Sequence, residues 1–149
     1  MIRAHDSIIV QTLSRLLIPL VQIYAIYILF FGQYSPGGGF AAGVIFGASL
    51  ILAVLVFGPD NYSGAVARKV LRGDGFGLVV FAGVGGLCLI GGGEYLNYAA
   101  LEIPGLSQPA RRSLGIVLTQ IGVALDIVMT AVSIVFSLSF IAHNEASSD

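Results

Sequence analysis

Charged residues are scarce in this chain. Only 10% of its 149 residues are Asp, Glu, Lys or Arg, whereas 56% are hydrophobic. A water-soluble domain carries about 25% charged residues, so most of the surface of this protein must face lipid instead of water. The formal net charge of −1 comes without a basic patch, which excludes the electrostatic footprint of a nucleic-acid-binding protein.

Cysteine and histidine are scarce as well. The single cysteine, Cys88, has no partner for an intrachain disulfide, and no Cys/His cluster indicates a metal site. The glycine-rich stretch 36–39 lacks the Lys and Ser/Thr of a phosphate-binding loop, and the sequence has no nucleophile motif. We therefore expect no metal, no cofactor and no enzymatic activity of this chain on its own.

Long apolar runs dominate the sequence instead. A membrane span needs about 20 apolar residues, and four runs have roughly this character: Ser7–Gly32, Phe40–Phe57, Gly75–Gly93 and Ser113–Ile141. Strands of a membrane barrel are about 10 residues long and alternate in polarity, whereas these runs are longer and continuous. The sequence predicts an all-α membrane protein, with residues 1–149 forming a single membrane domain of four transmembrane helices.

The basic residues beside these runs predict the orientation. With four spans, the N-terminus, the second connection and the C-terminus share one membrane face. That face holds five basic residues: Arg3, Arg15, Arg68, Lys69 and Arg72. The opposite face holds Arg111 and Arg112. Because cytoplasmic segments are enriched in Lys and Arg, we expect both termini on the cytoplasmic side.

A proline–glycine turn joins the first two runs. Pro36 lacks a backbone donor, and Gly37, Gly38 and Gly39 leave the chain free to reverse direction before Phe40. Between two membrane spans, this turn must reverse the chain at a bilayer face. We expect it to wedge between neighbouring helices.

The second run continues this turn with a ladder of glycines. Gly43 and Gly47 follow Gly39 at four-residue spacing, which places all three on one stripe of a helix. Small residues at this spacing let the backbone of another helix approach closely. We therefore predict that this stripe is a helix-packing surface.

Asp126 is the only ionisable residue deep inside a predicted span. An ionised Asp at this depth costs about 3 kcal/mol or more. At about 100° per residue, small and polar residues share its face of the helix: Gly115, Thr119, Gly122, Thr130, Ser133 and Ser137. Either this face lines a hydrated path where Asp126 binds a proton or a cation, or a neutral Asp126 holds two helices together. The sequence leaves both interpretations open.

Two further polar residues lie at the ends of predicted spans. Gln33 precedes the proline–glycine turn and can both donate and accept hydrogen bonds. Glu94 follows three glycines and either lines the mouth of a cavity or marks the end of a helix, the interpretation that we favour. Both are candidates for an ion or proton path.

Two stretches resemble a known family. Residues 32–40, followed by Ala42-Gly43, look like the signature turn of the MnhB/MrpB family, and residues 112–116 with 120–123 are similar to its last helix. Members are small four-helix subunits of the multisubunit Mrp cation/proton antiporters, and relatives occur in membrane arms of energy-converting hydrogenases. The resemblance implies a multi-pass protein of a prokaryotic cell membrane that binds other membrane subunits. It also implies Na⁺ or another monovalent cation, and H⁺, as the transported ions.

The chain also departs from this family's pattern. Gln33 stands where the family has a His, and Gln120 stands near a position that is often acidic in the family. Both differences remove an ionisable group, whereas Asp126 adds one within a span.

The resemblance implies an accessory, structurally essential subunit of a sodium/proton antiporter that contributes to an ion or proton path. Two alternatives remain open. The first is the same type of subunit in the membrane arm of a redox-driven, hydrogenase-like complex. The second is a small channel of identical copies, in which a ring of Asp126 side chains coordinates a cation.

Overall fold

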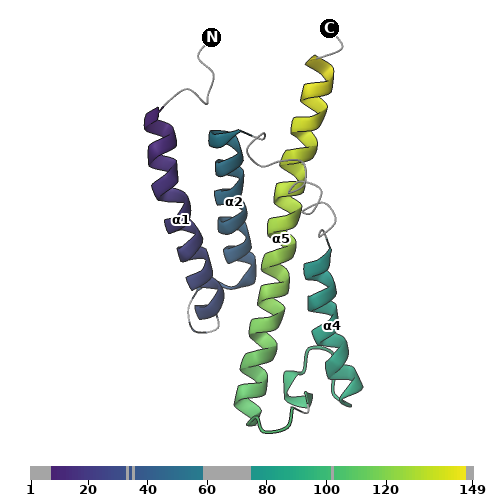
Figure 1. Cartoon of the computed structure of the whole chain (residues 1–149). Coiled ribbons are helices and arrows are strands. Elements are labelled where there is room, and N and C mark those ends of the chain that lie inside the picture. Colours follow the sequence, from purple (N-terminus) through teal and green to yellow (C-terminus); the bar gives the residue numbers. More distant parts are fainter. Residues whose placement is uncertain (1–7, 33, 35, 59–74, 102, 147–149) are drawn as a thin grey trace.

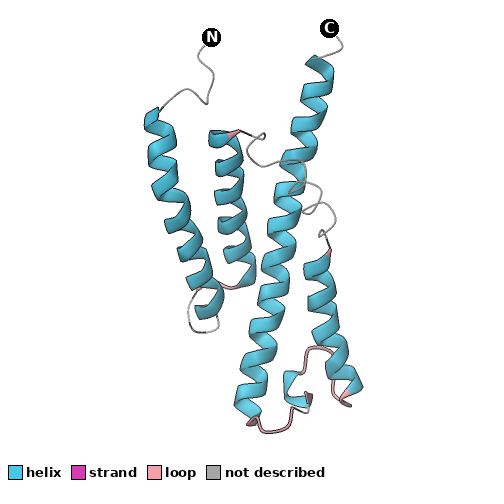
Figure 2. Ribbon diagram, viewed as in Figure 1, coloured by secondary structure: helices cyan, strands magenta, loops and turns pink. Residues whose placement is uncertain are grey.

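The computed structural model describes residues 8–32, 34, 36–58, 75–101 and 103–146, and only the backbone of residues 139–146. These residues form four long helices and a short 3-10 turn: α1 (Ile8–Phe31), α2 (Gly39–Phe57), α4 (Phe76–Ile90), η3 (Tyr98–Ala100) and α5 (Gln108–Ala146) (Figure 1). No strand occurs among the described residues (Figure 2). The prediction of an all-α protein is confirmed.

Three of the described helices have the length and composition of membrane spans: α1, α2 and residues Gln108–Leu138 of α5. Helix α4 is apolar but has 15 residues. At 1.5 Å per residue it is about 22 Å long, compared with about 30 Å for the hydrocarbon core of a bilayer. It ends at Ile90 instead of Gly93, because the chain turns here and Gly92 adopts a φ of +77°, a conformation that favours glycine.

Helix α5 is longer than the sequence indicates. It begins at Gln108, not at Ser113, and includes Pro109 in its first turn. Proline is tolerated there because the first N–H groups of a helix have no intrahelical partner. With 39 residues, α5 is about 58 Å long, so it extends beyond the hydrocarbon core of a bilayer.

Helix α5 lies at the centre of the arrangement. Helix α2 packs along one side of it and α4 along another, while α1 packs mainly on α2 (Figure 1). The two sides are staggered, since α1 and α2 lie beside the C-terminal half of α5 and α4 beside its N-terminal half (Figure 1). As a result, α4 begins near the middle of α5. The start of α1 and the end of α5 lie at the same end of the bundle (Figure 1).

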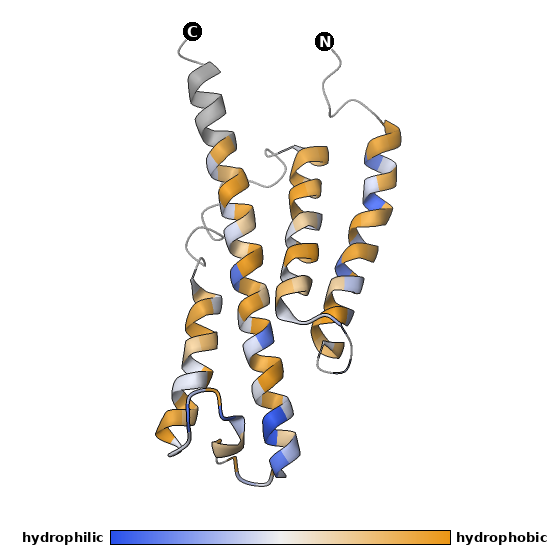
Figure 3. Ribbon diagram, turned by 180° about the vertical axis from the view of Figure 1, so that it is seen from behind, coloured by the Kyte–Doolittle hydropathy of each residue, from blue (hydrophilic) through white to orange (hydrophobic). Residues whose placement is uncertain are grey.

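The interior of the bundle is built largely from small side chains. Buried residues include Ala25, Ala42, Ala53 and Ala124, which let the helices approach closely. Many large apolar side chains remain exposed on the outside, and apolar residues extend along all four helices (Figure 3). A surface of this kind is stable against lipid or against apolar helices of other proteins.

Candidate functional site

The glycines of α2 pack directly on α5. A Cβ atom at Gly39 would overlap the carbonyl oxygen of Gln120, and one at Gly43 would lie 2.9 Å from the carbonyl oxygen of Ala124. Gly47 is packed less tightly, because its Cβ would lie 3.5 Å from the nearest atom of α5, an ordinary van der Waals distance. The helix that approaches this glycine ladder is therefore α5 of the same chain.

The turn over residues 36–40 closes against the end of α1. Gly38 is buried and adopts a φ of +114°, which favours glycine. A Cβ at Gly37 would lie 2.7 Å from Cγ2 of Ile28 in α1. The turn thus holds α1 and α2 together within this chain, while the side chain of Phe40 is 69% exposed.

Tyr98 of η3 covers the N-terminal part of the polar face of α5. A Cβ at Gly115 would lie 2.5 Å from Cγ of the tyrosine ring. The Tyr98 hydroxyl oxygen lies 3.1 Å from Oγ1 of Thr119. Thr119 is buried and donates to the carbonyl oxygens of Gly115 or Ile116, at 3.0 and 2.9 Å. Because a hydroxyl has a single proton, Tyr98 donates to Thr119.

The backbones of α4 and α5 touch further along the same face. A Cβ at Gly77 would overlap the carbonyl oxygen of Gly122. A Cβ at Gly122 would lie 2.8 Å from the carbonyl oxygen of Gly77 and 3.1 Å from the backbone nitrogen of Phe81. Both glycines are buried, so no side chain fits between the helices at this point.

Asp126 lies beside the first turn of α4. A Cβ at Gly77 would lie 2.5 Å from the backbone nitrogen of Asp126 and 2.7 Å from its Cβ. The side chain of Asp126 is half-buried. The first N–H groups of a helix lack intrahelical partners and form the positive end of its dipole, which favours negative charge nearby. The start of α4 therefore provides an electrostatic neighbour for the one carboxyl group in the middle of α5.

Beyond Asp126 the polar face becomes accessible. Thr130 and Ser137 are exposed. Ser133 is 7% exposed, and its hydroxyl has no hydrogen-bond partner among the described residues. The structure therefore divides the polar face at Gly122 into a covered N-terminal part and a more open C-terminal part.

Glu94 lies outside the helices, four positions after the end of α4 at Ile90. Its side chain is exposed, and its carbonyl oxygen accepts a hydrogen bond of 3.0 Å from the backbone nitrogen of Asn97 in a turn. Glu94 is therefore separated from Asp126 by the length of α4. Gln33, the other candidate at the end of a span, lies outside the described residues.

The described residues hold no cluster of three or more His, Cys, Asp or Glu side chains suited to a metal ion. Cys88 is buried in α4, where its thiol donates to the carbonyl oxygen of Val84 at 3.3 Å. This side chain packs within the bundle and takes no part in the polar face of α5.

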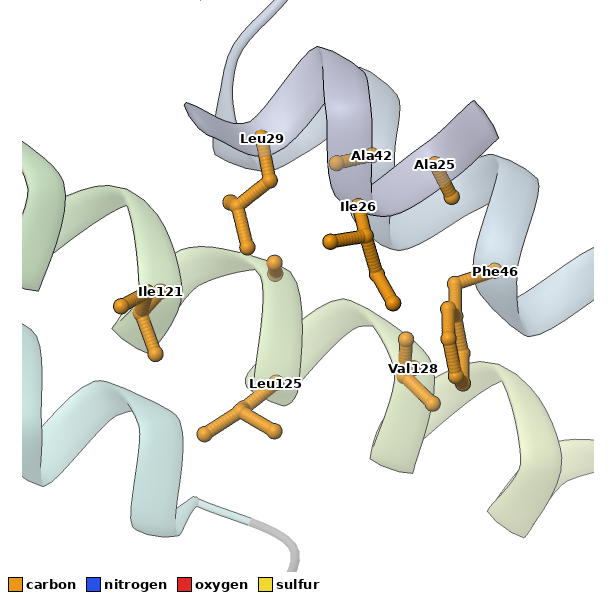
Figure 4. A pocket seen from close by; sticks show the side chains of 9 residues that line it. Ala25, Ile26, Leu29, Ala42, Phe46, Ile121, Leu125 and Val128 are labelled. Atoms are coloured by element: carbon orange, nitrogen blue, oxygen red, sulfur yellow. The ribbon is translucent and has the colours of Figure 1, made fainter. Parts of the chain in front are cut away.

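A pocket of about 160 Å³ lies where α1, α2 and α5 meet (Figure 4). Its lining is entirely apolar: Ala25, Ile26, Leu29, Ala42, Phe46, Ile121, Ala124, Leu125 and Val128. A cavity of about 150 Å³ lined by aliphatic and aromatic residues stays free of water. Ile121 and Val128 also lie on the side of α5 away from Asp126, so the pocket is separate from the polar face.

Comparison with known proteins identifies the family. The model of the family described as a domain related to the MnhB subunit of Na⁺/H⁺ antiporter matches residues 9–144. The chain is 32% identical over 133 residues to a Na⁺/H⁺ antiporter subunit of Alkalihalophilus pseudofirmus, covering 84% of this chain and 92% of the relative. It is 27% identical over 134 residues to the protein of the same name from Bacillus subtilis, with the same coverage. A "Putative antiporter subunit mnhB2" of Staphylococcus aureus is 30% identical over 57 residues, 38% of this chain and 40% of that protein. The chain belongs to the MnhB family.

Proposed function

We propose that this chain is the MnhB-type subunit of a multisubunit sodium/proton antiporter in a prokaryotic cell membrane. The observation that carries this proposal is the family match over residues 9–144. It is supported by two relatives named as Na⁺/H⁺ antiporter subunits, which the alignments cover over 92% of their length. As a subunit, the chain works with other membrane proteins of the complex, and the ions are Na⁺ or another monovalent cation, and H⁺.

The proposed topology has four crossings with both termini in the cytoplasm. It is supported by the start of α1 and the end of α5, which lie at the same end of the bundle (Figure 1). Arg15 lies at this end, with its guanidinium carbon 5.8 Å from the centroid of the Phe57 ring at the end of α2. In this proposal α4 makes the third crossing, with the polar connection before it completing the distance that its 15 residues leave.

Asp126 is the residue of this chain that we propose for the ion or proton path. It lies in the middle of α5, half-buried, beside the positive end of the α4 dipole. Thr130 and Ser133 continue the polar face from Asp126 toward the C-terminal end of α5. Hydroxyl and carboxyl oxygens in this order form a polar track for a hydrated proton or a small cation.

Purification of the tagged chain from native membranes in mild detergent tests the assignment. Mass spectrometry of the co-purified proteins should find large antiporter-like membrane subunits. Iron–sulfur or other redox subunits in their place would move the chain into a redox-driven, hydrogenase-like complex. A species made of this chain alone would contradict both assignments and favour the small channel.

A further inference from the structure

We infer that the Asp126 carboxyl is reached by water and ions from one membrane face only, the face at the C-terminal end of α5. The inference rests on the proposed function of this chain in an ion path and adds a direction to it. Three observations on the polar face of α5 carry it: a backbone contact, a covering tyrosine and an open segment.

The backbone contact between α4 and α5 closes the face immediately N-terminal to Asp126. Gly77 and Gly122 are both buried, and the carbonyl oxygen of Gly77 lies 2.8 Å from the place of a Cβ at Gly122. A chain of water molecules needs a gap about as wide as one probe sphere, bordered by polar partners. The contact of the two backbones fills that space on the route from Asp126 to Thr119.

Tyr98 closes the face a second time, closer to the N-terminal end of α5. Its ring covers Gly115, and its hydroxyl donates to Thr119. The Thr119 hydroxyl in turn donates to a backbone carbonyl of the same helix. Because these hydroxyl groups already have partners within the chain, this part of the face offers little to a passing ion.

The opposite direction is open. From Asp126 to Ser137 the distance along the helix is about 16 Å, and Thr130 and Ser137 are exposed along it. The buried hydroxyl of Ser133 has no hydrogen-bond partner among the described residues, as expected of a group that meets water or an ion in the complete assembly.

A path that is open to one face and closed to the other cannot carry an ion across the membrane within this chain. We therefore expect that the exposed side of α5 at Thr130 lies against a membrane helix of another subunit. That helix would carry polar groups and provide the remaining part of the path.

Cysteine accessibility tests the inference directly. In a Cys88→Ala background, single cysteines are placed at Asp126, Thr130 and Ser137, with Thr119→Cys as a buried control and Arg112→Cys to mark the N-terminal face of α5. A charged, membrane-impermeant methanethiosulfonate reagent is then added to closed vesicles of either orientation that contain the intact complex. We expect the cysteines at 126, 130 and 137 to react only from the face opposite to Arg112→Cys, and Thr119→Cys to react from neither face.

Several results would overturn the inference. Reaction of Asp126→Cys from the Arg112 face, from both faces, or from neither face would show that the carboxyl is not reached as we describe. If Asp126→Cys fails to assemble, the exposed positions 130 and 137 still decide the direction. The readout is independent of antiport, so one-sided access together with full activity of Asp126→Asn would retain the access route and remove Asp126 from the proposed ion path.

Discussion

Gly77 of α4 and Asp126 of α5 lie so close together that a Cβ at Gly77 would be 2.7 Å from the Cβ of Asp126. This contact joins the first turn of α4 to the middle of α5. It places the positive end of a helix dipole beside the chain's mid-span carboxyl, and it closes the polar face on one side of that carboxyl. The packing of α4 and the environment of Asp126 are therefore coupled.

Substitution of Gly77 by alanine should separate α4 from α5. The new methyl group would overlap the carbonyl oxygen of Gly122, and because backbone atoms form the contact, one of the helices must move. Overpacking of this kind typically costs about 1–3 kcal/mol. We expect a lower midpoint of thermal unfolding for the purified complex. Gly83→Ala is the matched control, since a Cβ at Gly83 of the same helix meets no atom within 4 Å. An equal effect of both substitutions would refute this account of the contact.

The glycine ladder of α2 supplies a second matched pair. Gly43→Ala brings a methyl group to 2.9 Å from the backbone carbonyl oxygen of Ala124, whereas at Gly47 the nearest atom of α5 is 3.5 Å away. We expect Gly43→Ala to destabilise the bundle by about 1–3 kcal/mol and Gly47→Ala to be tolerated. Denaturation of the purified complex in detergent measures both variants. Tolerance of Gly43→Ala would mean that α2 and α5 are less tightly packed than we describe.

Arg111 should hold the segment before α5 in place. Its Nη1 donates to the carbonyl oxygen of Leu101 at 3.0 Å, while the adjacent Arg112 is exposed. A hydrogen bond to a charged group contributes about 1.5–3 kcal/mol, so Arg111→Gln should raise the amide hydrogen exchange of residues 98–101 by about tenfold or more. Arg112→Gln should leave the exchange unchanged. Identical exchange in the two variants would argue against this role of Arg111.

The sequence predicts the helices well because their signals are local. Long apolar runs give the positions of α1, α2 and α5, and helical periodicity groups Asp126 with Thr119, Thr130 and Ser133 on one face. The end of α4 is less predictable. Three successive glycines are compatible with either a helix or a turn, and the structure forms a turn there.

Periodicity does not reveal which neighbour covers a face. The ladder of Gly39, Gly43 and Gly47 indicates a close helix contact, but only the fold identifies α5 as the partner. The cover provided by Tyr98 was likewise not predicted, because it lies in a connection without a periodic pattern. The late start of α4 at the depth of Asp126 also depends on tertiary packing.

The most direct measurement for the proposed ion path is sodium/proton antiport by membrane vesicles that contain the complex with Asp126→Asn. This substitution keeps the size of the side chain and removes its charge. Glu94→Gln is the control, since it makes the same chemical change at an exposed turn outside the helices. We expect Asp126→Asn to lower antiport while the complex still assembles in normal amount, and Glu94→Gln to retain it. Full antiport by an assembled Asp126→Asn complex would contradict the account and leave Asp126 as a contact between helices.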